Sequence, residues 1–195
     1  MDTVDALDGV EIKTFADSAE LEAWLATHHE LPTGVWLKIA KKGSGLRSVT
    51  VTEALDVALC YGWIDGQRRG YDATHYLQKY TQRRPRSLWS KVNVGKVEAL
   101  TAAGRMREPG LAEVAAAQAD GRWAAAYESQ RNATVPDDLA AALKGNQQAA
   151  EFFGRLGKTD RYLVMLGLMT ARSPEARAAR LEKAIAELAA GRKAR

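Results

Sequence analysis

The chain has 195 residues, of which 46% are hydrophobic and 27% are charged, and its formal net charge is +4. This composition is typical of a globular protein with one sizeable core, with or without a helical appendage, and it argues against a disordered chain. No run reaches the roughly 18 apolar residues that a membrane helix needs, so we expect no membrane insertion. The sequence begins with Met1-Asp2-Thr3-Val4-Asp5, which is acidic where a signal peptide is basic, and we therefore expect a cytoplasmic protein.

The few cysteine and histidine residues argue against a metal site. Cys60 is the single cysteine, so the chain has no internal disulfide and fits a reducing compartment. It lies in a helical pattern and is expected to be a small buried residue rather than a nucleophile. His28 and His29 are adjacent and point in different directions on a helix, while His75 stands alone. We expect no metal and no cofactor.

Charge is distributed unevenly along the chain. Residues 1–66 carry a net charge of −6, residues 67–107 carry +8, residues 108–171 carry −2 and residues 172–195 carry +4. The +8 segment forms an anion-facing surface, or its cations pair with the acidic side chains of the first 66 residues. The sequence leaves both interpretations open.

The first part of the chain mixes helix and strand patterns. Residues 1–13 are expected to be a loosely attached leader, and a helix is expected after Asp17, which can cap it together with Glu20. Residues 35–42 alternate Val35, Leu37 and Ile39 with Trp36, Lys38 and Ala40, which predicts a half-buried strand.

A second capping pair, Thr50 and Glu53, opens a helix that runs through Leu59 and that Gly62 can close. Two strands, Trp63–Gly70 and His75–Arg83, are expected to form a hairpin around the turn at Tyr71-Asp72.

From Ser90 onward the pattern is helical. Ser90 caps one helix, and Ser173 caps the last, with Pro174 at its first position and Gly191 at its end. Between them we expect helices at Leu111–Ala119, Gly121–Tyr127, Asp138–Leu143, Gln147–Leu156 and Asp160–Ala171. The sequence therefore predicts an α+β fold, with a small antiparallel sheet and flanking helices in the N-terminal part, followed by an all-helical C-terminal part. The expected domain limits are 14–130 and 135–192.

Residues 62–106 concentrate basic and aromatic side chains. Arginine offers a planar fork of donors and tryptophan offers a stacking face, and a helix start at Ser90 would add free backbone amides beside Arg84 and Arg86. This combination predicts an anion-binding site. Its candidate ligand-binding residues are Trp63, Asp65, Arg68, Arg83, Arg84, Trp89, Ser90 and Asn93.

Structural roles compete with these assignments. Tryptophans such as Trp63 and Trp89 are more often core anchors than stacking surfaces. Asp65 is expected to pair with an arginine or hold a turn rather than act as a general base. Ser87 and Ser90 have no histidine nearby in sequence, so neither is assigned as a nucleophile. Nothing amounts to a catalytic signature, and no catalytic residue is assigned.

Several motifs resemble a known family. They are Gly62-Trp63-Ile64-Asp65-Gly66, the run from Tyr80-Thr81-Gln82-Arg83-Arg84-Pro85-Arg86 to Asn93, Asp120-Gly121-Arg122-Trp123, and Ser173-Pro174-Glu175-Ala176-Arg177. Their order and spacing resemble the YdeI/OmpD-associated family, often labelled bacteriocin-protection proteins. The resemblance implies a YdeI-like domain at 14–130, an OmpD-associated-like helical region at 135–192, and a role in tolerance of bacteriocins or envelope stress. The segment from Asp160 to Thr170 is more apolar than the family's usual helix there, which points to a self-association face.

We therefore expect a cytoplasmic stress- or bacteriocin-tolerance protein that binds a small anionic ligand or a protein partner through the basic aromatic site. Nucleic-acid binding is the second hypothesis, because Tyr76, Tyr80 and Trp89 are interleaved with the basic residues, although no recognised nucleic-acid motif appears. An enzyme that uses Asp65 or a neighbouring serine on an anionic substrate is the third. The sequence does not indicate an oligomeric state.

Overall fold

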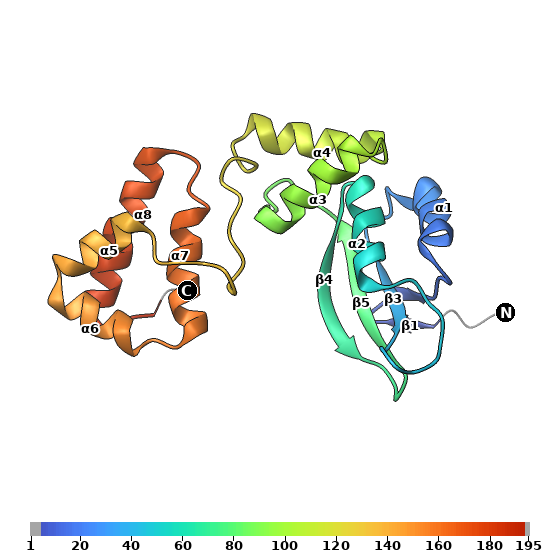
Figure 1. Cartoon of the computed structure of the whole chain (residues 1–195), viewed down its shortest axis with the longest axis horizontal. Coiled ribbons are helices and arrows are strands. Elements are labelled where there is room, and N and C mark those ends of the chain that lie inside the picture. The colour runs from blue at the N-terminus through green and yellow to red at the C-terminus, as the bar shows by residue number, and fades with distance from the viewer. Residues whose placement is uncertain (1–4, 194–195) are drawn as a thin grey trace. The chain divides into compact units, whose positions relative to one another are not determined.

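A computed structural model describes residues 5–193 of the chain. These residues divide into two units, which are described separately (Figure 1). Unit 1 contains the residues up to Ser87 and the segment Gly95–Ala116, and unit 2 contains Leu88–Val94 and the residues from Ala117 onward. Within residues 5–193, no helix has the length and apolarity that crossing a membrane requires.

The secondary structure confirms the predicted α+β class. In chain order, the strands and helices of the first part are β1 (Ala6–Leu7), β2 (Val10–Lys13), α1 (Ser18–His28), β3 (Val35–Ala40), α2 (Val51–Cys60), β4 (Trp63–Gly70) and β5 (His75–Gln82). They are followed by α3 (Lys91–Ala102), α4 (Glu108–Ala119), α5 (Asp137–Lys144), α6 (Gln147–Arg155), α7 (Lys158–Met169) and α8 (Pro174–Ala189). The helical C-terminal part is therefore as expected, and the domain limits of 14–130 and 135–192 stay a prediction.

The sheet of unit 1 has the strand order β1-β2-β3-β5-β4. Its neighbours are antiparallel except β2 and β3, which are parallel, so the sheet is mixed where a purely antiparallel one was expected. β2 and β3 can be parallel because α1 connects them. The helix returns the chain to the end of the sheet where β2 begins, so that β3 runs in the same direction as β2.

The expected leader is wrong over the part of it that the structure describes. Ala6–Leu7 and Val10–Lys13 are strands, and residues 1–4 lie outside the described range. Asp8 and Gly9 form the two-residue turn between these strands, with φ angles of 54° and 74°. Asp-Gly is a strong sequence signal for this kind of turn, and the shortness of the flanking strands hid it.

Strand β3 is buried on both faces at Trp36, whereas Lys38 and Ala40 on the same face as Trp36 are only partly buried. Trp36, which alternates with Val35 and Leu37, is only 1% exposed. It packs with Val10 of β2 and Leu77 of β5, so the strands of the expected leader cover the face that the pattern left open.

Helix caps follow the sequence closely. The Asp17 carboxylate accepts hydrogen bonds from the backbone amides of Ala19 and Glu20, each at 3.1 Å, and Thr50 and Glu53 form the predicted capping box. Ser173 caps α8. The helix predicted at Gly121–Tyr127 is wrong, because this segment forms turns and Tyr127 makes a parallel β-bridge with Ser90.

Helices α5–α8 enclose the core of unit 2. Its buried side chains are Leu139, Leu143, Ala149, Phe153, Leu156, Val164, Met165, Leu168 and Leu188. The Arg177 guanidinium links α8 to α5, because it donates to both Asp138 carboxylate oxygens, at 2.7 and 2.9 Å.

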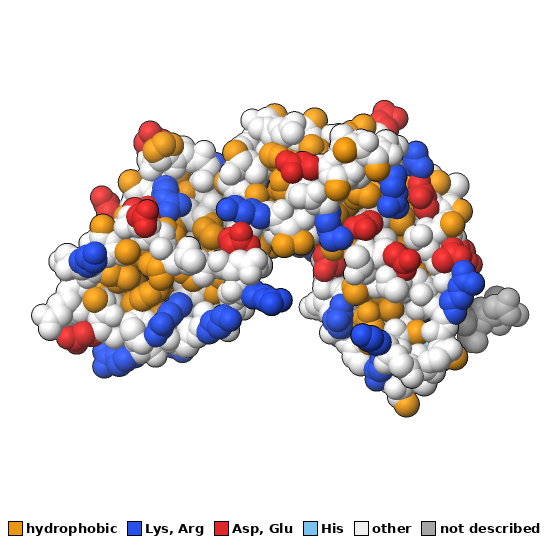
Figure 2. All heavy atoms as spheres, viewed as in Figure 1, with side chains coloured by type: hydrophobic (Ala, Val, Ile, Leu, Met, Phe, Trp, Pro, Cys, Tyr) orange, Lys and Arg blue, Asp and Glu red, His pale blue; other side chains and the backbone are white. Residues whose placement is uncertain are grey.

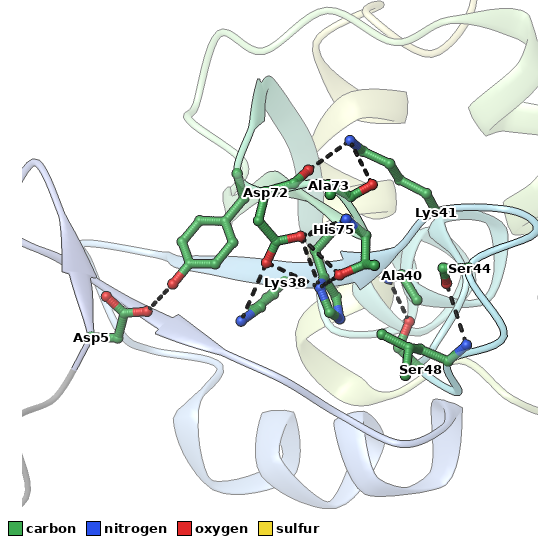
Figure 3. Close-up of polar contacts among 12 residues, drawn as sticks. Asp5, Lys38, Ala40, Lys41, Ser44, Ser48, Asp72, Ala73 and His75 are labelled. Atoms are coloured by element: carbon green, nitrogen blue, oxygen red, sulfur yellow. Dashed lines mark hydrogen bonds and ion pairs between the residues drawn. The ribbon is translucent and has the colours of Figure 1, made fainter.

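A polar network closes the β4–β5 hairpin (Figure 3). The Asp72 carboxylate accepts hydrogen bonds from the amides of Thr74 and His75, both at 2.7 Å, and from the Thr74 hydroxyl at 2.9 Å. Lys41 donates to the Asp72 carbonyl at 2.7 Å. Desolvation raises the pKa of Asp72, but the hydrogen bonds from Thr74 and His75 to its carboxylate outweigh this effect and hold that pKa well below its usual range.

Replacing Asp72 by asparagine is expected to reduce stability at neutral pH and to flatten the loss of stability in acid. A depressed pKa stabilises the fold above the unfolded-state value of about 3.9, and this contribution disappears as the pH falls through the folded-state pKa. Urea denaturation at a series of pH values should show the wild type more stable than the variant at pH 7, with a difference that begins to shrink only below about pH 4. Asp65→Asn, on the exposed part of β4, is the control and should stay within about 0.5 kcal/mol of the wild type.

Candidate functional site

A cavity of about 510 Å³ lies in unit 1 where several elements begin or end. Its wall comes from the residues after α1, the C-terminal end of α2, the C-terminal end of β5 and the first turns of α4. The polar side chains of the lining are His29, Glu30, Tyr61, Gln82, Arg83, Glu108 and Glu113.

Two glycines allow α4 to form one wall of this cavity. Gly62 has a φ of +74°, and a Cβ there would lie 3.0 Å from both the Glu113 Cγ and the Pro109 carbonyl oxygen. A Cβ on Gly110 would lie 2.2 Å from the Cys60 carbonyl oxygen. The start of α4 therefore packs directly against the backbone at the end of α2.

Hydrogen bonds to the backbone carbonyls of Gly62 and His29 position the other walls of the cavity. The Gly62 carbonyl accepts from the amide of Arg83 at 3.0 Å, which joins the end of β5 to the end of α2. The His29 backbone carbonyl accepts from the indole of Trp63 at 2.7 Å and from the side-chain amide of Gln82 at 2.6 Å. These bonds fix the position of His29 after the end of α1.

The lining mixes one guanidinium with several carboxylates. Arg83 is only 5% exposed, whereas Glu30, Glu108 and Glu113 bring negative charge to the same cavity. The Nδ1 atom of His29 is buried and has no hydrogen-bond partner within residues 5–193. The site thus combines a buried cation with acceptors that suit a donor-rich or cationic group.

The residues just outside the lining are structural. Burial is the main cause that raises the pKa of the Cys60 thiol, which agrees with a packing role. Hydrogen bonds, first with Glu22 and then with Tyr61, raise the pKa of Arg107, and its guanidinium lies 2.6 Å from the Glu22 carboxylate. Within residues 5–193, no group of three or more histidine, cysteine, aspartate or glutamate side chains is arranged to hold a metal ion.

Of the candidate residues predicted from sequence, five lie in unit 1. Arg83 lines the cavity, and Trp63, fully buried, supports the cavity wall through its bond to His29. Arg68 donates to the Gln78 side chain at 2.9 Å and stacks over Tyr76 at 4.6 Å. Asp65 and Arg84 are exposed and do not line the cavity.

The remaining candidates lie in unit 2. Trp89 is 2% exposed and packs on Trp123, with ring centroids 4.9 Å apart, so it is a core anchor. The Ser90 hydroxyl accepts from the Asn93 amide at 3.1 Å and caps α3. The structure therefore places only Arg83 of the predicted set in the cavity lining.

Ion pairs within unit 1 account for part of the +8 segment. Three of its cations bind carboxylates of the first 66 residues: Arg69 with Asp8 at 3.1 Å, Lys96 with Asp56 at 2.6 Å and Arg107 with Glu22 at 2.6 Å. The interpretation based on internal pairing is thus correct for these three side chains.

Sequence reasoning missed most of the lining. His29, Tyr61 and Glu113 come from three separate elements, and none belongs to a recognisable motif. The available signal was the glycine pattern, since Gly62 and Gly110 mark the two places where backbone segments approach closely.

Family models match two separate parts of the chain. Residues 13–113, just over half of the sequence, match the model described as "Domain of unknown function (DUF8412)", and residues 132–191 match "Bacteriocin-protection, YdeI or OmpD-Associated". Comparisons with curated proteins and with solved structures gave no match. The resemblance noted from sequence is confirmed over residues 132–191, whereas the motifs around Trp63 and Arg83 fall within the first match. The chain therefore belongs to the DUF8412 family, and its residues 132–191 match the YdeI/OmpD-associated, bacteriocin-protection family model.

Proposed function

We propose that this protein is a cytoplasmic binding protein of bacteriocin or stress tolerance, and that its unit 1 cavity holds a small ligand with an anionic group. The observation that carries the proposal is Arg83, which is 95% shielded from solvent and yet forms part of a cavity wall. A guanidinium in a desolvated setting binds carboxylate or phosphate oxygens with two parallel hydrogen bonds. The cavity volume of about 510 Å³ suits a small molecule.

The carboxylates of the lining restrict the ligand further. A purely anionic molecule would be repelled by Glu30, Glu108 and Glu113, so the favoured ligand carries an ammonium or another donor-rich group beside its anionic group. A zwitterion, such as an amino acid or a short peptide, meets both requirements.

Binding is favoured over catalysis by the composition of the lining. It contains no serine, which was the alternative to Asp65 in the enzyme hypothesis. Asp65, the catalytic candidate of the enzyme hypothesis, is exposed and does not line the cavity.

Nucleic-acid binding has less support than small-ligand binding. Of the aromatic residues interleaved with the basic block, Tyr80 and Trp89 are each 2% exposed, and Arg68 covers one face of the partly buried Tyr76. Base stacking requires an accessible ring face.

Isothermal titration of a panel of amino acids and dipeptides tests the proposal. We expect Arg83→Gln to weaken binding by roughly tenfold or more, since a charge-assisted hydrogen bond contributes about 1.5–3 kcal/mol. Its neighbour Arg84→Gln is the matched control and should leave the affinity unchanged, because Arg84 is exposed and outside the lining.

A second variant guards against a folding defect at the buried Arg83. Ala112 is an exposed residue of α4 that lines the cavity, so Ala112→Phe should obstruct it while leaving the urea midpoint near that of the wild type. Cells that produce either variant should also survive a bacteriocin challenge less well than cells that produce the wild type. If binding and survival persist in Arg83→Gln and in Ala112→Phe, the cavity is not the site.

A further inference from the structure

Unit 2 contains a groove of about 760 Å³ between α7 and α8. Its apolar lining residues are Leu163, which is 40% exposed, the half-buried Ala184, and the buried Val164, Leu168 and Leu188. On this unit, Figure 2 shows hydrophobic side chains open to solvent and bordered by lysine and arginine. This groove is separate from the unit 1 cavity and plays no part in the proposed binding of a small ligand.

The arrangement of the groove's lining residues suits the packing of one more helix. Lys193, beyond the end of α8, lies 2.8 Å from Asp160 at the start of α7, so the two helices run antiparallel. The lining residues recur at spacings of four: Leu163 and Gly167, Val164 and Leu168, and Arg180, Ala184 and Leu188. Rows of this spacing form the ridges and grooves into which a further helix packs, and the α8 row alone extends for about 12 Å.

Gly167 leaves space in the middle of this groove. A Cβ at this position would have no neighbouring atom within 4 Å. Glycine inside a helix costs about 0.5–1 kcal/mol relative to alanine, and the side chain that is absent here would project into open space. A bound helix can therefore approach the backbone of α7 closely.

Charge around the groove specifies the partner. The lining contains Arg180, Lys183, Arg192 and Lys193, and one acidic side chain, Glu187. Ion pairs neutralise two of these cations, since Arg192 binds Glu187 at 2.5 Å and Lys193 binds Asp160 at 2.8 Å, whereas Arg180 donates to the Gly167 carbonyl at 2.7 Å. Within residues 5–193, Lys183 has no ion-pair partner within 4.0 Å. This excess of cations favours an acidic partner.

The same excess disfavours the self-association face that the apolar sequence of α7 suggested. A two-fold symmetric contact through this face would gather both copies of Arg180 and Lys183 in one interface, and neighbouring like charges are costly there. We propose that the groove between α7 and α8 receives an acidic amphipathic helix of a partner protein, with apolar side chains against Leu163 and Ala184 and carboxylates toward Lys183 and Arg180.

Fluorescence polarisation with the full-length protein tests this assignment. The probe is a labelled helical peptide of about 15 residues with leucine at a spacing of three and four on one face and glutamate elsewhere. The comparison peptide has lysine in place of every glutamate. We expect saturable binding of the acidic peptide that weakens with added salt, and no binding of the basic peptide.

Two glycine variants decide whether the peptide occupies this groove. Gly167→Leu should weaken binding at least tenfold by obstructing the groove, without loss of stability, because its side chain starts in open space. Gly154→Leu is the matched control, since Gly154 is also an exposed helical glycine with nothing within 4 Å and lies outside the groove. It should leave the affinity unchanged.

Three results would overturn the assignment: absence of acidic-peptide binding, equal binding of both peptides, and undiminished binding by Gly167→Leu. If the acidic peptide does not bind but the fatty acid laurate does, the groove is a site for a small apolar molecule instead. Concentration-dependent dimerisation that Gly167→Leu abolishes would instead assign the groove to a second copy of the chain. Ala112→Phe, which obstructs the unit 1 cavity, should leave peptide binding unchanged, so failure of either proposal is seen independently of the other.

Discussion

Gly110→Ala is expected to destabilise unit 1 by about 3 kcal/mol or more. The added Cβ would lie 2.2 Å from the Cys60 carbonyl oxygen, 2.7 Å from the Cys60 carbonyl carbon and 2.8 Å from the Leu59 carbonyl oxygen. All three are backbone atoms, so α4 would have to move away from α2 to relieve the contacts. Urea denaturation measures the loss.

Gly95→Ala is the matched control for this substitution. Gly95 lies in α3, also in unit 1, and a Cβ there would meet nothing within 4 Å. The same chemical change should therefore stabilise the protein by about 0.5–1 kcal/mol. Equal midpoints for Gly110→Ala and the wild type would contradict the packing of α4 on α2 and the cavity wall that depends on it.

Trp89→Ala is expected to destabilise unit 2 by about 3–5 kcal/mol, the usual cost of removing a large buried aromatic side chain. Trp89 is 2% exposed and its ring packs on Trp123, so the variant should also lose near-ultraviolet circular dichroism from this pair. Trp89→Phe keeps part of the packing and should lose less.

Val92 provides the control on the same segment. It is 51% exposed, so Val92→Ala should change the unfolding free energy by no more than about 0.5 kcal/mol. If Trp89→Ala retained wild-type stability and lost only ligand affinity, Trp89 would be a binding residue rather than a core anchor.

Features controlled by neighbouring residues were predictable from the sequence. The caps at Asp17, Thr50 and Ser173 depend on hydrogen bonds that span only a few residues, and each side chain accepts the backbone amide that its position predicts. The β4–β5 hairpin was predictable for the same reason, since its turn and strands are contiguous.

Features that depend on residues far apart in the sequence could not be predicted from it. Trp36 follows an alternating pattern that leaves one face open, and only the pairing of β2 with β3 buries that face. The cavity could not be predicted for the same reason. Its residues His29 and Arg83 are brought together by hydrogen bonds with Trp63, Gln82 and Gly62. A local pattern indicates which residues can be buried, but the tertiary fold decides which of them lie together.

Because α4 packs closely on α2, the thiol of Cys60 at the end of α2 can report how often this region of the protein opens. Cys60 is the only cysteine in the sequence and is 2% exposed, with its carbonyl oxygen against Gly110. A thiol reagent can modify it only when the surrounding structure opens. The modification rate in excess reagent therefore measures how often this region opens while the rest of the chain stays folded. A ligand that bridges the cavity walls should slow this rate in proportion to its occupancy, with no label attached to the protein beforehand.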